Sequence, residues 1–342
     1  MEALILAGGE GTRMNRITAH LPKALLYLPG GTLLEHHLAL LARLTLSHVY
    51  VITKHEGWQI KEALRDLHAV TSLTQEPPYT LLGALATAKA RIQEACLVVH
   101  GDNYFSEPLD YVADAARTVT ERSGCEALFV VDGAGKGVCQ AERLALTGCY
   151  VLSPMVFARA REVRDGNELR CLTQALVDSG VGVEECALRG WRQNINRPGD
   201  LLAVTRRILE HWTDGFHPPQ ADAGYDRAGR SFEIEPPVWV SPQASVVDSH
   251  LGPFTVVGPG ARVRGCALQE TVVFPGAQVV CQDVVRGTVL CASEGCARLA
   301  AESDVHRCDE GYSQQEVTQR TPSADQQEHA RQQEAGEGDN VD

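Results

Sequence analysis

The chain has 342 residues, of which 44% are apolar and 22% charged, and its formal net charge is −13. This length allows one large domain or two ordinary ones with a sizeable buried core. The charge leaves no basic surplus to neutralise a phosphate backbone, which argues against a nucleic-acid-binding protein. The sequence has no run of about 18 apolar residues, so we expect neither a membrane-spanning helix nor a membrane partner.

The eleven cysteines are odd in number and follow no recognisable spacing. The first residues carry no basic leader, and a glycine-rich turn cuts their apolar run short, so a signal peptide is not expected. We therefore expect a cytoplasmic protein with reduced thiols rather than a disulfide-bonded secreted one.

Short apolar runs alternate with helical periods over residues 1–215. Strands are expected at 4–7, 49–52, 97–99 and 128–131, and helices at 32–44, 58–67, 83–94 and 109–121. The alternation predicts βαβ units and hence an α/β fold, in which helices cover both faces of a doubly wound, mostly parallel sheet. Ligands of such sheets bind at the carboxyl ends of the strands.

The composition changes after residue 215. Residues 216–234 are rich in Pro, Gly and Asp, which is typical of a linker. In residues 235–300 valines recur every six positions, as at Val257 and Val263, with Pro-Gly pairs between them. This period predicts a short β-solenoid of hexapeptides with about three coils, and an ordinary β-rich domain is the alternative. Residues 301–342 are acidic and lack Leu, Ile, Phe and Trp, so we expect a disordered tail.

The first expected strand leads into Leu6-Ala7-Gly8-Gly9-Glu10-Gly11-Thr12-Arg13-Met14. Three glycines after a buried strand allow backbone N–H groups to close around a phosphate, and Arg13 and Lys23 add cations. The loop is not a Walker A motif, because no Gly-Lys-Ser/Thr follows. It is not a dinucleotide fingerprint either, because Met14 stands where the third glycine belongs. The loop therefore indicates a ligand rich in phosphate, such as a nucleoside triphosphate.

Three segments together resemble the signature of the sugar-phosphate nucleotidyltransferases: Gly8-Gly9-Glu10-Gly11-Thr12-Arg13, Pro22-Lys23-Ala24-Leu25-Leu26 and Gly31-Thr32-Leu33-Leu34-Glu35-His36. The resemblance covers about residues 1–210, and the expected solenoid fits family members with a C-terminal left-handed β-helix. It implies an enzyme that condenses a nucleoside triphosphate with a sugar 1-phosphate and releases pyrophosphate. The solenoid would then mediate contacts in a homo-oligomer.

The resemblance also implies a Mg²⁺ site. His100-Gly101-Asp102-Asn103 ends an expected strand, where the family has its metal-binding Asp. The segment from Trp191 to Leu201 resembles the one that carries the second ligand, with Asn194 in the position of an Asp. The implied metal ligands are Asp102 and Asn194, with Asn196 as a less expected substitute. A turn or helix-capping role is the alternative for Asn194.

The nucleotide contacts implied by the resemblance fall into two groups. Arg13 and Lys23 are the implied catalytic residues. The implied nucleotide-binding residues are Ala7, Gly8, Gly9, Gly11, Thr12, Gln75 and Thr80. Thr80-Leu81 replaces the family's usual Gly-Thr, which leaves the base open. The layout most resembles the guanylyltransferases of mannose 1-phosphate and valienol 1-phosphate, so GTP is the expected substrate.

The acceptor side departs from the family, because its Glu-Lys-Pro segment is missing. Gly148 and Glu168 match positions that bind the sugar phosphate. The acceptor is therefore expected to be a sugar 1-phosphate or a sugar-like cyclitol 1-phosphate of the kind used in natural-product pathways such as antibiotic biosynthesis. The alternative is a catalytically silent regulatory subunit of the same fold that binds a nucleotide sugar.

Overall fold

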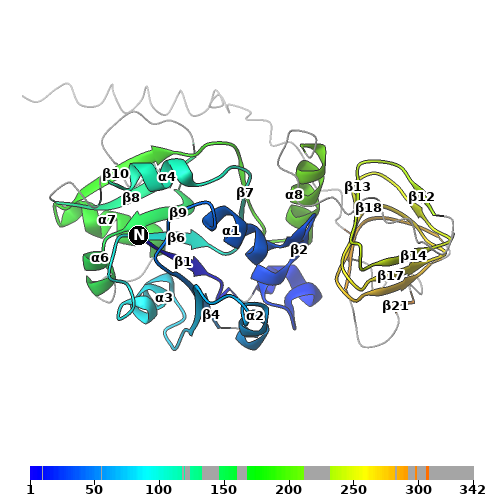
Figure 1. The fold of residues 1–342 in the computed structure, drawn as a ribbon, viewed down its shortest axis with the longest axis horizontal. Coiled ribbons are helices and arrows are strands. Elements are labelled where there is room, and N and C mark those ends of the chain that lie inside the picture. Colours follow the sequence, from blue (N-terminus) through cyan, green and yellow to red (C-terminus); the bar gives the residue numbers. More distant parts are fainter. Residues whose placement is uncertain are drawn as a thin grey trace, which may run out of the picture. The chain divides into compact units, whose positions relative to one another are not determined.

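The main sheet forms where the sequence has short runs of apolar and β-branched residues, and Figure 1 shows its twist. In the computed structural model its seven strands run in the order β10-β8-β9-β6-β1-β4-β5. Their bounds are β1 Glu2–Leu6, β4 Val49–Thr53, β5 Val70–Thr74, β6 Cys96–His100, β8 Cys125–Val131, β9 Leu146–Leu152 and β10 Gly182–Ala187. All neighbours are parallel except that β9 is antiparallel to β6 and β8. The predicted doubly wound, mostly parallel sheet is therefore confirmed.

The structure describes only part of the chain. The described residues are 1–9, 11–54, 56–117, 119, 124–132, 146–159, 168–211, 232–281, 283–291, 297–298 and 306–307. Most of the predicted linker at 216–234 and of the predicted tail at 301–342 lies outside these ranges.

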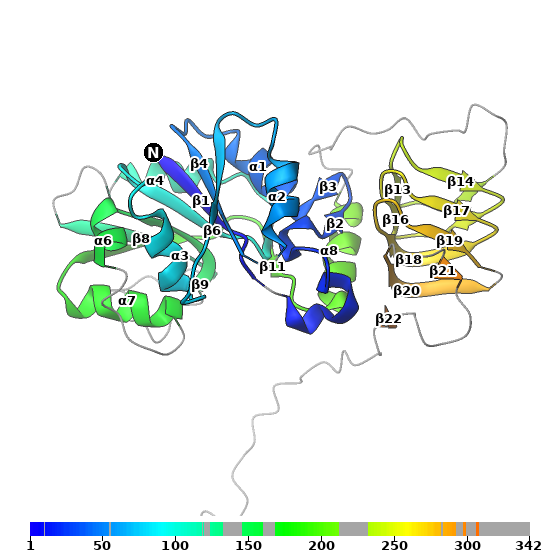
Figure 2. The same ribbon diagram turned by 90° about the horizontal axis from the view of Figure 1, so that it is seen from below.

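Helices cover both faces of the sheet, as Figures 1 and 2 show. Their bounds are α1 Leu33–Leu41, α2 Gly57–Ala63, α3 Leu81–Ala88, α4 Asp110–Ala115, α6 Pro154–Arg159 and α7 Glu168–Asp178. Ala3 and Ile5 of β1 pack in one apolar cluster with α1, α2 and α4, whereas Leu4 packs in the other cluster with α3, α6 and α7. Alternate side chains of a buried strand thus build two cores.

Element boundaries differ from those predicted. The helix expected at 83–94 is α3 and begins earlier, because the Thr80 side chain caps it by accepting from the Gly83 N–H at 3.0 Å. Strand β5 was not expected, because its sequence Val-Thr-Ser-Leu-Thr is largely polar. As the last strand of the sheet it is only partly buried, and polar residues are tolerated at such an edge.

Four neighbouring parallel strands, β6-β1-β4-β5, end at the same edge of the sheet. The segments that follow them carry, respectively, Asp102, the glycine-rich loop, Lys54 and Gln75. Parallel pairing therefore gathers residues that lie up to about a hundred positions apart in the sequence, and this edge is where a ligand is expected.

Smaller elements complete this edge. They are two short 3-10 helices, η1 Thr12–Thr18 and η2 Lys23–Leu25, the strands β2 Tyr27–Leu28, β3 Gly31–Thr32, β7 Asn103–Phe105 and β11 Arg192–Asn194, and helix α8 Pro198–Glu210. Strand β11 pairs with β7 in antiparallel register, which sets Asn194 opposite Asn103. This pairing brings the segment around residue 194 next to the end of β6.

Parallel strands also fill the region after residue 232, and Figure 2 shows them stacked. They are β12 Glu233–Ile234, β13 Val238–Val240, β14 Ser245–Val247, β15 His250–Leu251, β16 Thr255–Val257, β17 Arg262–Arg264, β18 Ala267–Val273, β19 Gln278–Val280, β20 Val284–Leu290 and β21 Ala297–Arg298, with β22 His306–Arg307 antiparallel to β20. These sheets are compatible with the predicted β-solenoid.

The spacing of these strands is shorter than predicted. Ser245 pairs with Arg262 and Arg262 with Gln278, so partners lie 17 and then 16 residues apart rather than the 18 of three hexapeptides. The buried valines do stack as their six-residue spacing indicated, since Val263 pairs with both Val246 and Val279.

The buried His37 links helix α1 to the edge of the sheet where a ligand is expected. The ring of His37 is 1% exposed, and its Nε2 lies 2.6 Å from the Asn103 carbonyl oxygen. Burial lowers the pKa of His37 to about 4, although the Asn103 carbonyl and the charge of Asp102 act in the opposite direction. The ring is therefore neutral in the folded protein at neutral pH.

This burial predicts a pH-dependent stability. The ring in the unfolded chain takes up a proton near pH 6.5, whereas the native ring stays neutral down to about pH 4. The unfolded state thus binds more protons between these values, so the free energy of unfolding should fall as the pH drops from 6.5 to 4. His37→Gln keeps a donor for the Asn103 carbonyl but removes the ring that binds this proton. The number of protons taken up on unfolding, which sets the slope, should therefore fall by up to one. Urea unfolding followed by circular dichroism at each pH measures the free energy of unfolding.

His68→Gln is the control for replacing a histidine by glutamine at an exposed position. Equal slopes for His37→Gln and the wild type would contradict the assignment of this proton to His37.

Candidate active site

A cluster of charged and polar side chains forms where the end of β6 meets η2. The Lys23 ammonium donates to Asp102 Oδ2 at 3.0 Å and to Asn196 Oδ1 at 2.8 Å. The Arg13 guanidinium donates to the same Asn196 oxygen at 2.9 Å. Lys23 is 6% exposed, so its charge is held largely inside the protein by these two oxygens. A buried ammonium needs such partners, and an anion that replaces them would be bound strongly.

The cluster borders a cavity of about 220 Å³. Its lining combines the signature loop, Lys23 and Asp102 with uncharged residues such as Tyr79, Leu81 and Ala84. Seven of the predicted site residues line it: Ala7, Gly8, Gly9, Lys23, Gln75, Thr80 and Asp102. A lining that combines a cation and glycine amides with apolar side chains suits a ligand that joins phosphates to an aromatic base.

The remaining predicted residues of the glycine-rich loop do not line the cavity. Gly11 has a φ of 66°, a conformation that favours glycine, and its carbonyl accepts from the Met14 N–H and the Thr18 hydroxyl, each at 2.7 Å. Thr12 opens η1 next to it. These contacts fix the turn from which Arg13 reaches Asn196.

Asn103 is a residue of this site to which the sequence assigned no role. It is buried, its Nδ2 donates to Asp102 Oδ1 at 3.0 Å, and its Oδ1 accepts from Arg192 at 3.2 Å. Gly148 leaves the room for this amide, because a Cβ at position 148 would lie 3.0 Å from Asn103 Nδ2. Both oxygens of Asp102 are therefore oriented by neighbours. In the sequence, only the position of Asn103 directly after Asp102 could have indicated its role.

The two candidate asparagines differ in their surroundings. Asn196 bonds both Lys23 and Arg13, as described above. Asn194 lies on β11, and its Oδ1 is buried with no hydrogen-bond partner in the described part of the chain. A buried carbonyl oxygen of this kind is uncommon, because it loses the hydrogen bond that water would give it. Asn194 thus offers an oxygen for a ligand, whereas Asn196 holds the two cations.

Gln75 is buried at the end of β5 and has its amide protons engaged. Its Nε2 donates to the carbonyls of Pro78 at 3.0 Å and Thr80 at 2.8 Å. The opposite orientation would set an oxygen against two oxygens, so the side chain is left with Oε1 as an acceptor. Lys54 Nζ lies 3.8 Å from the centre of the Tyr79 ring, a cation–π contact with an aromatic side chain that lines the cavity.

Gly148, a predicted contact of the sugar phosphate, lies next to the end of β6. This residue lies on β9 with a φ of 77°, and a Cβ there would also approach His100, at 3.1 Å from its Cβ. The His100 ring lines the cavity, and burial lowers its pKa. Glu168 begins α7, but its side chain lies outside the described residues, as do residues 133–145.

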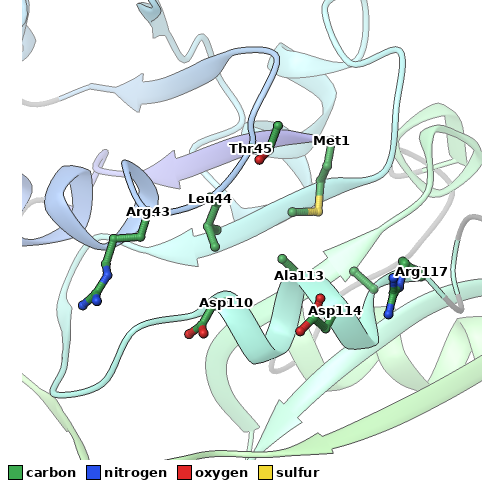
Figure 3. A pocket seen from close by; sticks show the side chains of 9 residues that line it. Met1, Arg43, Leu44, Thr45, Asp110, Ala113, Asp114 and Arg117 are labelled. Carbon is green, nitrogen blue, oxygen red and sulfur yellow. The ribbon is translucent and has the colours of Figure 1, made fainter.

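A second hollow lies at the start of β1 (Figure 3), and its volume is about 420 Å³. The segment after α1 and helix α4 form its walls, and its rim carries Arg43, Asp110, Asp114 and Arg117. None of the residues predicted to bind substrate lines it. It lies at the amino end of β1, whereas ligands of parallel sheets bind at the carboxyl end, so the smaller cavity is the candidate active site.

Two kinds of structure are absent from the described ranges. No group of three or more His, Cys, Asp or Glu side chains in them is placed to hold a metal ion. No helix in them is both long enough and apolar enough to cross a bilayer. A metal at this site would therefore rely on asparagine or ligand oxygens in addition to Asp102.

Comparisons with known proteins agree with this site. Residues 3–302 match the MobA-like NTP transferase domain. A glucose-1-phosphate thymidylyltransferase of Streptomyces antibioticus is 24% identical over 85% of this chain and 92% of its own length. A mannose-1-phosphate guanylyltransferase of Mycobacterium tuberculosis is 24% identical over 82% and 81%. A UTP–glucose-1-phosphate uridylyltransferase of Haloferax volcanii is 27% identical over 62% and 98%.

A solved structure from Bacillus anthracis, assigned as a glucose-1-phosphate thymidylyltransferase, shares the fold with a TM-score of 0.51 and 19% identity, over 60% of this chain and 94% of its own. The predicted membership of the sugar-phosphate nucleotidyltransferases is confirmed by the family match and the relatives together. The chain belongs to the family of MobA-like NTP transferase domains, and its relatives are sugar-1-phosphate nucleotidylyltransferases.

Proposed function

We propose that this chain joins a nucleoside triphosphate to a sugar 1-phosphate, or to a sugar-like cyclitol 1-phosphate, and releases pyrophosphate. The observation that carries the proposal is the Lys23 ammonium, held between Asp102 and Asn196 in the wall of a cavity that the glycine-rich loop also lines. A fixed cation and glycine amides in one cavity suit a triphosphate. The relatives, whose names give glucose 1-phosphate or mannose 1-phosphate as substrate, support the same reaction.

The reaction proposed is an in-line attack of a sugar-phosphate oxygen on the α-phosphorus. One P–O bond forms while the bond to the leaving pyrophosphate breaks, so the protein supplies position and charge rather than a nucleophile. Lys23 neutralises the α-phosphate and the incoming phosphate. Arg13 and the amides of Gly9 and Gly11 hold the leaving β- and γ-phosphates. Gly148 and Glu168 remain the proposed contacts of the acceptor.

Magnesium is the proposed cofactor, and the oxygen donors near the end of β6 fit it. Asp102 supplies a carboxylate that Asn103 and Lys23 already orient. Asn194, on the strand paired with β7, supplies the buried Oδ1 that has no hydrogen-bond partner among the described residues. Mg²⁺ takes one or two protein oxygens and fills its remaining positions with phosphate oxygens and water. When bound, it supplies positive charge to the phosphates during transfer.

The finer proposal for the nucleotide is GTP. The relatives named above carry thymidylyl, uridylyl and guanylyl specificities, so they leave the base open. Gln75, with both amide protons engaged, offers only an acceptor. An acceptor suits a base that presents a ring N–H, which guanine does, and uracil and thymine do as well. Ala7, Gly8, Thr12 and Thr80 complete the proposed nucleotide contacts.

Each segment of the chain has its own proposed role. Residues 1–215 would carry the transferase activity, 216–234 the linker, 235–300 the solenoid and 301–342 the acidic tail. The parallel strands after residue 235 are proposed to mediate contacts in a homo-oligomer.

A silent regulatory subunit that binds a nucleotide sugar is the second candidate function. Asn194 in place of the family's Asp, and the missing Glu-Lys-Pro segment, favour it. The test is a screen of the four ribonucleoside triphosphates and dTTP against hexose and cyclitol 1-phosphates. Pyrophosphate and a nucleoside-diphosphate product, identified by mass spectrometry, would support the enzyme. Saturable binding of a nucleotide sugar with no product from any pair would support the regulatory subunit instead.

The proposed role of Lys23 predicts a large kinetic effect. Lys23→Ala removes the cation next to the reacting phosphates, so kcat/KM should fall about 10²–10³-fold, as for comparable electrostatic groups. Lys61→Ala is the matched control, because Lys61 is exposed on α2. Steady-state pyrophosphate release measures both variants. Wild-type turnover in Lys23→Ala would contradict the assignment.

The metal proposal predicts opposite effects at Asn194. Asn194→Asp should lower the Mg²⁺ concentration for half-maximal rate, because a carboxylate strengthens a hard-cation site, whereas Asn194→Ala should raise it. Asn196→Ala should mainly raise the KM for the triphosphate, since Asn196 holds Lys23 and Arg13. Asp102→Ala should nearly abolish activity. If Asn196→Ala shifts the Mg²⁺ requirement and Asn194→Ala does not, the assignment of Asn194 is wrong and Asn196 is the second metal ligand.

A further inference from the structure

Two cysteines meet at one corner of the stacked C-terminal strands. Cys266 follows β17 and Cys281 follows β19, and these strands are parallel neighbours in which Arg264 pairs with Val280. The Cys281 N–H donates to Cys266 Sγ at 3.2 Å, and the two thiol groups hydrogen-bond to each other. Both cysteines are free thiols and lie buried in the same apolar cluster. Strand pairing thus brings two sulfur atoms into direct contact.

The neighbouring strand on the other side shows that a sulfur atom is not needed to hold this corner together. Ser249 follows β14, which pairs with β17, and its Oγ accepts from the Cys266 N–H at 3.1 Å. Cys266 Sγ accepts from the Cys281 N–H in the same way. A serine therefore satisfies the N–H of the following strand as well as a cysteine does. What distinguishes the second contact is that the residue facing the acceptor is itself a cysteine.

The spacing of the strands suits a covalent bond between the two sulfur atoms. Neighbouring strands lie about 4.8 Å apart. The two Cα atoms of a disulfide are usually about 4.4–6.8 Å apart, so paired strands at this spacing can be bridged. Since the two thiols already touch, we expect rotation of the side chains, rather than movement of the strands, to bring the sulfur atoms to bonding distance.

The pair also has the chemistry of a reactive dithiol. The hydrogen bond from the Cys281 thiol lowers the pKa of Cys266, although burial opposes this effect. Burial alone acts strongly on Cys96, whose pKa is raised well above the usual value. The thiolate is the form that oxidants attack. Val280 and Val284, which are near Cys281 in the sequence, are 46% and 69% exposed, so this corner lies just beneath the surface.

We propose that Cys266 and Cys281 form a redox site, at which hydrogen peroxide converts the two thiols into a disulfide that links neighbouring strands. The Cys266 thiolate attacks one peroxide oxygen, which forms a sulfenic acid and releases hydroxide. The Cys281 sulfur then attacks the Cys266 sulfur, and the sulfenic oxygen leaves as water. Two thiols and one peroxide thus give one disulfide and two water molecules, and a dithiol reductant reverses the change.

This site shares no residue with the lining of the candidate active site. The inference therefore goes beyond the proposed function and does not depend on it. Failure of one would leave the other intact.

The sequence allows the disulfide to be measured directly. Trypsin cuts after Arg264 and Arg286, and the peptide between them holds Cys266 and Cys281 and no other cysteine. The folded full-length chain is treated with hydrogen peroxide, denatured, alkylated with iodoacetamide and digested. Mass spectrometry should find this peptide without alkyl groups and two hydrogen atoms lighter than its dithiol form. Treatment with dithiothreitol before alkylation should restore two alkylated cysteines.

Two controls separate the pair from general thiol oxidation. Cys96 is buried and is the one cysteine of the tryptic peptide 92–117, so it should still be alkylated after the same treatment. Cys266→Ser keeps an acceptor for the Cys281 N–H, as Ser249 does for the strand before, and should fold normally without forming the disulfide. Full alkylation of both cysteines at a peroxide dose that already oxidises Cys96 would overturn the proposal. Sulfinic acid at Cys266 with no disulfide would overturn it as well.

The bond should also stabilise the strands that it joins. The two cysteines are 15 positions apart. Closing a loop of this length restricts the unfolded chain, so the melting temperature should rise by about 5 °C on oxidation. Circular dichroism of oxidised and reduced protein measures the change, and Cys266→Ser should melt at the same temperature after both treatments. A disulfide-containing wild type that melts at or below the reduced form would show that the folded corner does not accommodate the bond.

Discussion

The contact between the Lys23 ammonium and the Asp102 carboxylate is the constraint on which the rest of the site depends. It joins residues 79 positions apart, and the lysine side chain is only 7% exposed. A charge so far from water needs a partner at every stage of a reaction, because an unpaired one would cost several kcal/mol. Asp102 and Asn196 provide that partner in the resting protein. A phosphate entering the cavity can take over the ammonium, which leaves the carboxylate free for a cation.

The sheet makes this contact possible. Because β6, β1, β4 and β5 are parallel neighbours, the loops that follow them meet at one edge, and the cavity forms there. The β7–β11 pair then brings in the segment around Asn194 and Asn196 from far along the chain. Asn103 connects these parts, since its backbone carbonyl lies 2.6 Å from His37 and its side chain bonds both Asp102 and Arg192. Rigid elements, rather than loops alone, therefore position the polar groups.

The fold class is predicted correctly from the sequence, and seven of the predicted site residues line one cavity, because both results depend on local patterns. Apolar runs such as Ala3-Leu4-Ile5 predict buried strands, and a glycine-rich loop directly after one predicts a phosphate site at the sheet edge. Contacts between distant side chains depend on strand register and rotamers, which no local pattern encodes. For this reason the sequence assigned no role to Asn103. Asn196 was considered only as a substitute metal ligand for Asn194, and its hydrogen bonds to Lys23 and Arg13 were not predicted. The polar edge strand β5 and the 16- or 17-residue spacing between paired C-terminal strands were not predicted for the same reason.

The most direct test of this account is a crystal structure of the chain with Mg²⁺ and a non-hydrolysable nucleoside triphosphate. The account predicts that the phosphates lie against the glycine-rich loop and that Lys23 Nζ is within hydrogen-bond distance of an α-phosphate oxygen. It also predicts that the metal contacts Asp102. A nucleotide bound instead in the hollow between Arg43 and Arg117, or a Lys23 that still bonds Asp102 and contacts no phosphate, would contradict it.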